Sequence, residues 1–159
     1  MGFDDGNIPL IPSMTSDTSP SGVVSYSTSY GASGQDPYMV FDGNDSTRGI
    51  LAKTSTSGSY FQYAFTKSVE ANRAKIIASN AGNTVHSEKW VIQGSNNGTA
   101  WTNISDEIEF SWTTTADTII KKQVSLYGGQ YTHYRIITTY VSGACHPCFW
   151  TFQIYDSIF

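Results

Sequence analysis

The amino-acid sequence predicts an all-β protein with two stacked antiparallel layers, and three observations support this prediction. Short runs of alternating apolar and polar residues recur along the chain, separated by clusters of Gly, Asn and Ser. Aromatic residues make up 14% of the chain and charged residues only 14%, a composition that favours strands over helices. No segment keeps an apolar period of about 3.6 residues. Because each strand has one apolar face, two sheets that pack these faces together form the most economical architecture.

The clearest predicted strand covers residues 59–65, where Phe61, Tyr63 and Phe65 alternate with less apolar neighbours. Similar patterns mark five further segments, which are predicted as strands at 74–79, 88–94, 118–126, 133–139 and 149–155. The inward-facing pairs of three of them are Trp90 with Ile92, Tyr134 with Ile136, and Phe152 with Ile154.

A tight turn is predicted at Asn97-Gly98, directly after the strand at 88–94. An aromatic residue lies on each side of this turn, and both of them, Trp90 and Trp101, are assigned to the core. Trp112 lies in the polar segment Ser-Trp-Thr-Thr-Thr, which favours exposure to solvent.

A chain of 159 residues is long enough to bury one substantial core, so we expect a single domain over residues 13–159. Residues 1–12 are interpreted as an extended arm, because the apolar Ile8, Leu10 and Ile11 follow neither a strand nor a helix period. We favour docking of these side chains on the domain itself over docking on a larger assembly.

The charge balance excludes two classes of partner. A net charge of −4 offers no basic surface to a phosphate backbone or an anionic lipid, so we expect binding neither to nucleic acid nor to membranes. No apolar stretch approaches the roughly 20 residues that span a bilayer. The first residues lack the basic and apolar parts of a cleaved signal peptide, so export by that route is not expected.

Four motifs follow one another along the chain: Phe-Asp-Gly-Asn-Asp-Ser-Thr at 41–47, Trp-Val-Ile-Gln-Gly-Ser-Asn-Asn-Gly-Thr-Ala-Trp at 90–101, Tyr-Arg-Ile at 134–136 and Phe-Gln-Ile-Tyr at 152–155. In this order they resemble the coagulation-factor type C, or discoidin-like, domain, whose relatives include the family-32 carbohydrate-binding modules. The resemblance implies a galactose-binding-like jelly-roll β-sandwich over most of the chain. The segment 11–27 also resembles the leader of such domains in bacteriophage tail and virion proteins, which implies a place in a viral particle.

Hard oxygen ligands of the kind that calcium takes are concentrated at residues 42–47, where Asp42, Asn44 and Thr47 offer a carboxylate, an amide and a hydroxyl. The resemblance implies a structural calcium ion held by Asp42, turn carbonyls and Thr47, together with a Glu from the last strand. Thr151 stands in the place of that Glu. Two alternatives stay open, namely one calcium ion bound with fewer charges and an ordinary Asx turn.

Cys145-His146-Pro147-Cys148 could supply half of a tetrahedral zinc site or a redox disulfide. The chain holds no second cysteine pair, and His86 and His133 lie at no recognisable ligand spacing. We therefore interpret the two cysteines as reduced thiols or as a local disulfide that stiffens a loop.

Catalytic motifs are absent from the sequence: it contains no Gly-x-Ser-x-Gly elbow, no His-Glu-x-x-His and no glycine-rich phosphate loop. We therefore do not expect an enzyme. The carboxylates that could form a hydrolytic pair are interpreted as solvated loop charges, and they are Asp4, Asp5, Asp106, Glu107, Glu109 and Asp117.

Binding by loops on a rigid sandwich is the remaining role, and a sugar needs an aromatic platform beside planar donors and acceptors. Such mixtures occur in the loops 30–38, 48–57, 80–87 and 140–150. The predicted ligand contacts are Arg48, Asn80, His86 and Trp150. Each also has a purely structural interpretation: a solvated charge, a turn residue, an exposed loop histidine and a core aromatic, in that order.

These observations lead to the hypothesis of a carbohydrate-binding module on a bacteriophage particle, with residues 1–12 as one candidate for attachment to other virion proteins. The expected partners are glycans and virion proteins, homo-oligomer formation stays open, and the expected location is the virion. The alternative is a structural decoration protein of the particle that binds no sugar.

Overall fold

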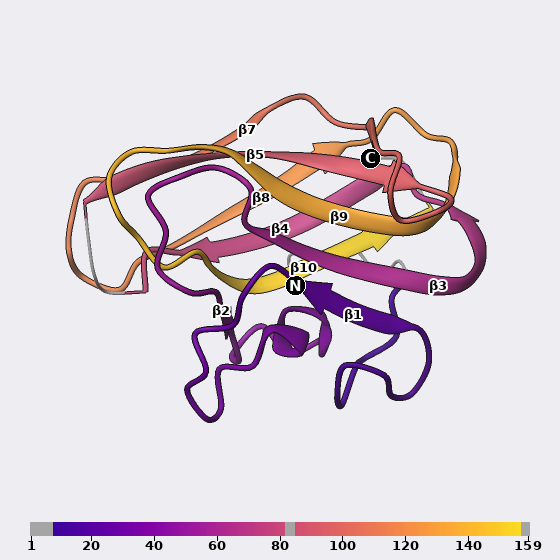
Figure 1. Cartoon of the computed structure of the whole chain (residues 1–159), viewed down its shortest axis with the longest axis horizontal. Coiled ribbons are helices and arrows are strands. Elements are labelled where there is room, and N and C mark those ends of the chain that lie inside the picture. Colours follow the sequence, from indigo (N-terminus) through magenta and orange to yellow (C-terminus); the bar gives the residue numbers. More distant parts are fainter. Residues whose placement is uncertain (1–7, 82–84, 157–159) are drawn as a thin grey trace.

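Two antiparallel β-sheets lie face to face in the computed structural model, which describes residues 8–81 and 85–156 (Figure 1). The first sheet has the strand order β1 (Val23–Tyr26), β3 (Tyr60–Glu70), β9 (Gln130–Val141), β5 (His86–Ser95) and β6 (Thr102–Asn103), and β7 (Ile108–Trp112) also pairs with β5. The second sheet has the order β2 (Gly49–Ile50), β10 (Cys148–Tyr155), β4 (Arg73–Ser79) and β8 (Ile119–Ser125).

The predicted fold class is confirmed, because the described segments form an all-β sandwich without an α-helix. A short 3-10 helix, η1 (Pro37–Phe41), is the helical element among them. All six predicted strands are present, and each overlaps one of the longer strands β3, β4, β5, β8, β9 and β10. The sequence analysis did not identify the shorter strands β1, β2, β6 and β7.

The core lies between the sheets and is built on stacked aromatic rings. The ring centroid of Trp90 in β5 lies 4.7 Å from that of Phe149 in β10, which links the two layers. Phe61 in β3 stacks on Phe149 at 5.1 Å. All three side chains are fully buried. Since large aromatic side chains supply much of the apolar area that folding buries, this cluster fixes how the sheets sit on one another.

Two of the tryptophan predictions are wrong. Trp101 was assigned to the core, yet it is only half-buried and lies against Arg135, with the guanidinium carbon 3.9 Å from the ring centroid. Trp112 was expected to be exposed, yet it is buried at the end of β7 and donates its indole N–H to the carbonyl of Thr118 at 2.8 Å. Its strand turns Ile108, Phe110 and Trp112 inward and the polar residues between them outward, a period of two that was available in the sequence.

The described part of the N-terminal segment, residues 8–12, lies along β10. Leu10 donates its N–H to the carbonyl of Ile154 at 2.9 Å. Ile11 is 1% exposed, and the amide of Gln153 bonds both its N–H, at 3.2 Å, and its carbonyl, at 3.1 Å. This segment therefore belongs to the packed structure at Ile11, while Ile8 is exposed. Residues 1–7 of the expected arm lie outside the described residues.

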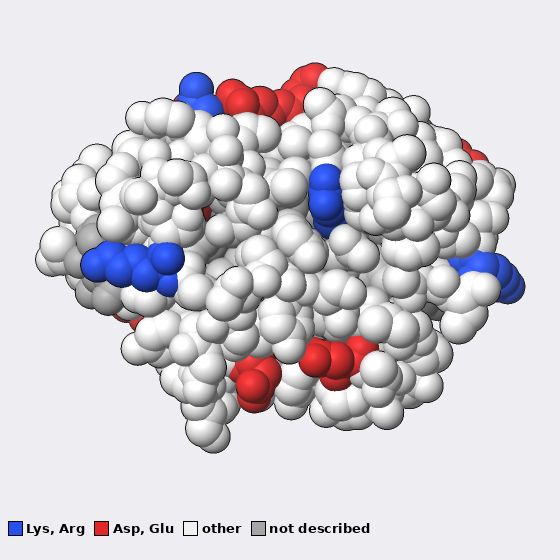
Figure 2. Space-filling view, viewed as in Figure 1, with Lys and Arg blue, Asp and Glu red and all other residues white. Residues whose placement is uncertain are grey.

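The surface of the sandwich carries little charge. Figure 2 shows sparse blue and red groups on one broad face, with the acidic groups gathered at its upper and lower margins. Across residues 8–81 and 85–156, no helix has the length and apolar character needed to cross a bilayer.

A candidate ligand-binding cavity lined by loops

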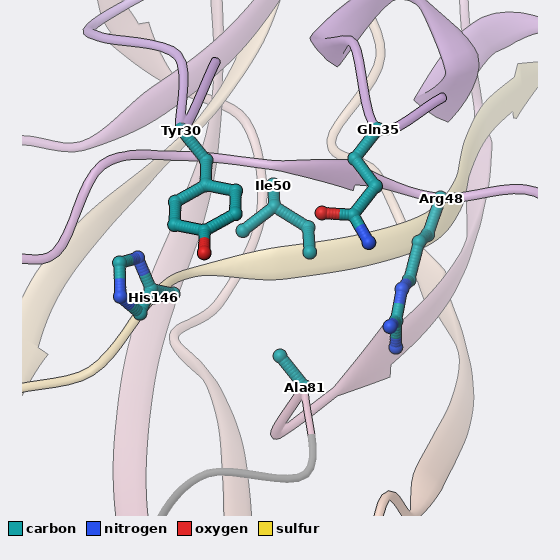
Figure 3. Close-up of a pocket in the computed structure, with 6 residues that line it drawn as sticks. All are labelled: Tyr30, Gln35, Arg48, Ile50, Ala81 and His146. Carbon is teal, nitrogen blue, oxygen red and sulfur yellow. The ribbon is translucent and has the colours of Figure 1, made fainter. Parts of the chain in front are cut away.

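A cavity of about 150 Å³ opens where the connections of the second sheet meet the loop after β1. Four segments contribute to it: the loop after β1, the chain entering and forming β2, the end of β4 and the chain entering β10. The lining residues are Tyr30, Gln35, Arg48, Ile50, Ala81 and His146. Figure 3 shows Tyr30 and His146 at one side, Gln35 and Arg48 at the other and Ala81 across from them.

Backbone hydrogen bonds hold the loop after β1 against β2. Tyr30 donates its N–H to the carbonyl of Ile50 at 3.0 Å, and Ile50 donates to the carbonyl of Gln35 at 3.2 Å. Gly31 and Gly34 adopt φ values of 84° and 77°, a left-handed conformation that glycine takes without steric cost. The two cavity side chains of this loop therefore stand on a backbone that is fixed before any ligand binds.

Tyr30 and His146 form the aromatic side of the cavity. Tyr30 is 50% exposed, and its ring meets that of His146 edge-on with the centroids 4.8 Å apart. The Nδ1 atom of His146 lies 3.2 Å from the carbonyl oxygen of Leu51. Because a carbonyl oxygen can only accept, Nδ1 carries the hydrogen, and Nε2 of the neutral ring is left as an acceptor. The cavity thus combines an exposed ring face with a hydrogen-bond acceptor.

Arg48 is anchored by Asp117, whose Oδ2 lies 2.7 Å from Nη1. Asp117 also accepts a hydrogen bond of 2.6 Å from the hydroxyl of Ser79. Partial burial opposes ionisation of Asp117, but the hydrogen bonds from Ser79 and Arg48 and the charge of Arg48 outweigh it, so the pKa of Asp117 falls below 3.8. Within the described residues the guanidinium makes no other hydrogen bond, which leaves its remaining N–H groups available to a ligand.

Trp150 supports Arg48 from the side. The pairing of β10 with β4 shifts register between Phe149 and Thr151, which makes Trp150 the extra residue of a β-bulge. The bulge leaves its side chain half-buried, with the guanidinium carbon of Arg48 5.7 Å from the ring centroid. The indole N–H of Trp150 is buried and has no hydrogen-bond partner in the part of the chain that the structure describes. Two of the predicted contact residues, Arg48 and Trp150, therefore do lie together.

Asn80 is buried and acts behind the cavity. Its Nδ2 donates to the carbonyl of Thr114 at 2.8 Å, and its Oδ1 accepts the N–H of Thr118 at 3.1 Å. These bonds fix the loop that carries Asp117, the partner of Arg48. The next residue, Ala81, lines the cavity with a φ of 56°, a conformation that is uncommon for a residue with a Cβ atom. Asn80 therefore positions the site instead of facing a ligand.

His86 is not an exposed loop histidine, and it does not line the cavity. It begins β5, and its side chain is 1% exposed. Its Nε2 lies 2.9 Å from Oε1 of Glu88, and Oε2 of the same carboxylate accepts the indole N–H of Trp90 at 2.8 Å. Cys145 donates its S–H to Glu88 at 3.4 Å. The period of two that puts Trp90 inward also puts residues 86 and 88 inward, and this signal was available in the sequence.

Both cysteines are free and buried. Burial raises the pKa of Cys145 well above its usual value, and the charge and hydrogen bond of Glu88 raise it further. Burial likewise raises the pKa of Cys148 to about 12. Cys145, His86 and Glu88 place one ligand atom each within 4.8 Å of one another, but a structural zinc site takes four ligands. The hydrogen bonds to Glu88 account for this cluster without a metal ion.

The side chains of the turn predicted to hold calcium, residues 42–47, are hydrogen-bonded within the turn and to the second sheet. One carboxylate oxygen of Asp42 accepts the N–H of Asn44 at 2.8 Å, and the other accepts the hydroxyl of Thr47. The second carboxylate of the turn, Asp45, accepts the hydroxyl of Thr151 at 2.6 Å and lies 3.4 Å from the ammonium group of Lys75. Calcium takes six to eight oxygen ligands, and its binding at this turn, beside the ammonium group of Lys75, stays a prediction from the sequence.

The carboxylates weighed as hydrolytic candidates are engaged elsewhere. Asp106, Glu107 and Glu109 border a second hollow of about 340 Å³ beside β7 and β8. Glu107 and Glu109 share Lys89, at 3.6 and 4.0 Å, and Asp106 accepts the hydroxyl of Tyr127. Asp117 is bound to Arg48. Asp4 and Asp5 lie outside the described residues.

Neither a family model nor a curated protein matches the chain. The fold recurs among solved structures of sugar-binding modules. Chitosan-binding module 2, derived from a chitosanase/glucanase of Paenibacillus sp. IK-5 and solved with chitotriose, has a TM-score of 0.64 and 19% identity over 84% of this chain and 95% of that one. CBM32 of AlyQ in complex with 4,5-unsaturated mannuronic acid has a TM-score of 0.61 and 19% identity over 85% and 95%. CpGH89CBM32-6 produced by Clostridium perfringens has a TM-score of 0.62 and 18% identity over 90% and 97%.

At such low identities these likenesses establish the fold. The chain has the two-sheet architecture of the family-32 carbohydrate-binding modules, as the sequence motifs implied. The match covers nearly the whole length of these modules.

Proposed function

We propose that this protein is a non-catalytic carbohydrate-binding module whose sugar site is the cavity between Tyr30 and Arg48. The observation that carries the proposal is the meeting of an exposed aromatic ring with planar polar groups from separate loops, all fixed by the sandwich. The architecture of sugar-binding modules supports the same assignment.

The chemistry of the cavity fits one sugar ring. The apolar C–H face of a sugar stacks on Tyr30, and its hydroxyl groups meet the amide of Gln35, the free N–H groups of Arg48 and Nε2 of His146. A cavity of about 150 Å³ is smaller than the roughly 300–1,000 Å³ that surround a drug-sized ligand. We therefore assign it the terminal unit of a glycan and expect modest affinity for each site.

The test of this proposal is the Tyr30→Ala variant, with Tyr140→Ala as the matched control because the two tyrosines are 50% and 49% exposed. A glycan array selects the ligand, and titration calorimetry measures its affinity. Loss of the stacking face should weaken binding by about 1–2 kcal/mol, roughly tenfold. Tyr140→Ala should bind like the wild type. Equal affinities for all three proteins, or no sugar bound by the wild type, would refute the proposal.

The finer proposal is that the module works on a bacteriophage particle, in the virion, and rests on the resemblance of residues 11–27. Many copies on one particle would offset weak single-site binding, since avidity multiplies modest affinity. Anchoring through the N-terminal segment is tested by deleting residues 1–9, which spares the buried Ile11. Purified particles should then lack the protein by mass spectrometry, and normal incorporation would exclude this anchor.

The alternative, a structural decoration protein without sugar binding, is separated by the same pair of experiments. It requires incorporation into the particle together with an empty glycan array. If the protein binds sugar but is missing from purified particles, the proposal of a sugar-binding module stands and the virion location is excluded.

A further inference from the structure

The outer face of the first sheet carries an aligned row of planar polar side chains. The strand register pairs Gln62 with Arg135, Arg135 with Gln93, and Gln93 with Asn103, across β3, β9, β5 and β6. Arg135 donates from Nε to Gln93 at 2.8 Å, and Gln93 donates from Nε2 to Asn103 at 2.8 Å. The row faces away from the core, because the neighbouring residue Ile136 is buried and side chains alternate along a strand.

Arg135 lies at the centre of this row between two aromatic rings. Its guanidinium carbon is 3.9 Å from the ring centroid of Trp101 and 5.6 Å from that of Tyr60. Cation–π contacts of this kind orient the guanidinium, but they do not neutralise its charge. Trp101 in turn meets the ring of His133 edge-on at 6.3 Å, which fixes the indole in place.

Among the described residues, no carboxylate forms an ion pair with Arg135. Within residues 8–81 and 85–156 its terminal nitrogens also donate no hydrogen bond. Partial burial lowers the pKa of its guanidinium, an effect that the neighbouring Tyr60 opposes. The arginine of the cavity differs, since Arg48 is bound to Asp117. The chain has a net charge of −4, yet this guanidinium is held in place without a counter-ion in the described segments. Its positive charge is therefore available to an anionic ligand.

We propose that Arg135, Trp101 and Tyr60, with the amide row beside them, form a second binding site that takes a uronate carboxylate of an acidic polysaccharide. The planar fork of a guanidinium matches the two oxygens of a carboxylate. The flanking rings offer stacking faces to a sugar, and the amides offer partners for its hydroxyl groups. The row crosses four strands at roughly 4.8 Å spacing, about 14 Å in all, so it can accompany a chain beyond one ring.

This inference extends the proposed sugar binding to a different face of the protein. Acidic ligands would bind at the sheet face, and the terminal sugar of a glycan would bind in the loop cavity. The two sites share no residue, so variants can address each of them alone.

The test compares trigalacturonate with its methyl ester, in which the carboxylates are masked, by calorimetry at low salt. The wild type should bind the acid at least about tenfold more tightly than the ester. Arg135→Gln should remove this preference, Arg135→Lys should keep part of it as a point charge, and raised salt should weaken it. Lys121→Gln, which removes one charge from β8 in the other sheet, should behave like the wild type.

Tyr30→Ala separates this inference from the proposed function, because it should lose the cavity ligand and keep the preference for the acid. The proposal is overturned if Arg135→Gln keeps the preference, if Tyr30→Ala loses it, or if dextran sulfate binds at Arg135 more tightly than trigalacturonate does. A measurement on the unchanged protein guards against misfolded variants: the NMR resonance of the Trp101 indole N–H should shift with the acid, and a resonance that stays in place contradicts the site.

Discussion

Glu88 shows how a single residue can serve the frame of the protein instead of its ligand site. Its carboxylate is fully buried and joins His86 and Trp90, both in β5, to Cys145 in the chain that enters β10. A buried carboxylate is tolerated only where its lone pairs are satisfied, and here three donors satisfy them. The network therefore locks the chain entering β10 onto β5, beside the loop that presents His146.

Glu88→Ala should be strongly destabilising, because it leaves three buried polar groups without their acceptor. We expect a loss of about 3–5 kcal/mol in the free energy of unfolding, measured by urea denaturation. Glu109→Ala is the control, since Glu109 is exposed and should change stability by less than about 0.5 kcal/mol. A loss of similar size in both variants would show that the network has no special weight.

The raised pKa values of Cys145 and Cys148 predict inert thiols in the folded protein. At pH 8 neither thiol should react with Ellman's reagent within minutes, because the reactive thiolate is scarce and both sulfurs are buried. Addition of urea should release both. Rapid reaction of the native protein would contradict this burial and would favour a redox role.

Asp117 gives the cavity a defined response to acid. Its pKa is lowered in the folded state, so its stabilising contact with Arg48 is complete above the unfolded value near 3.8 and is lost as the pH falls through the lower folded value. Sugar affinity measured by calorimetry should therefore be insensitive to the protonation of Asp117 between pH 5 and about 8 and fall only in strong acid. Asp117→Asn should reduce the sugar affinity across this whole pH range. An unchanged affinity would show that Asp117 does not contribute to sugar binding.

At the level of elements, the turn at residues 42–47 holds its own shape. Asp42 bonds two groups within the turn, and Asp45 is matched by Thr151 and Lys75 from the second sheet. We predict that adding calcium or the chelator EGTA changes Tm by less than about 1 °C. A ligand that binds only the folded state would raise Tm, and we expect no such binding at this turn. Asp42→Ala should lower Tm equally in either buffer. A clear rise in Tm with calcium would show that the turn binds the calcium ion that the sequence resemblance implied.

Elements with a long period of two were predictable from the sequence, and short edge strands were not. The alternation at 59–65 and 88–94 is carried by bulky side chains, so β3 and β5 were recognised. β2 and β6 are two residues each, and their pairing is set by β10 and β5 instead of by their own pattern. Such strands exist because a neighbour offers hydrogen bonds, which no local signal reveals.

The candidate site was predictable in its loops and less so in its residues. Of the predicted contacts, Arg48 lines the cavity and Trp150 lies beside Arg48, and the loops named for Tyr30, Gln35 and His146 meet at the cavity. The role of His86 was misjudged because the start of β5 was placed two residues too late, at Glu88. Composition marks which loops can bind, but only the fold decides which of their side chains share a space.

The whole molecule combines a rigid frame with two proposed recognition surfaces. Stacked aromatic rings and the Glu88 network fix the sheets, the loop ends present the cavity, and the outer sheet face presents Arg135. Because both surfaces are preorganised, binding should require little rearrangement of the backbone.

Sugar binding by the loops around Tyr30 is tested most directly by mapping amide NMR shifts during titration with the best neutral oligosaccharide from an array. We expect the largest shifts on residues 30–35, 48–50, 81 and 146, with little change along β7 and β8. Shifts centred on the acidic hollow at residues 106–109 and 122–125, or no shifts with any sugar, would contradict it.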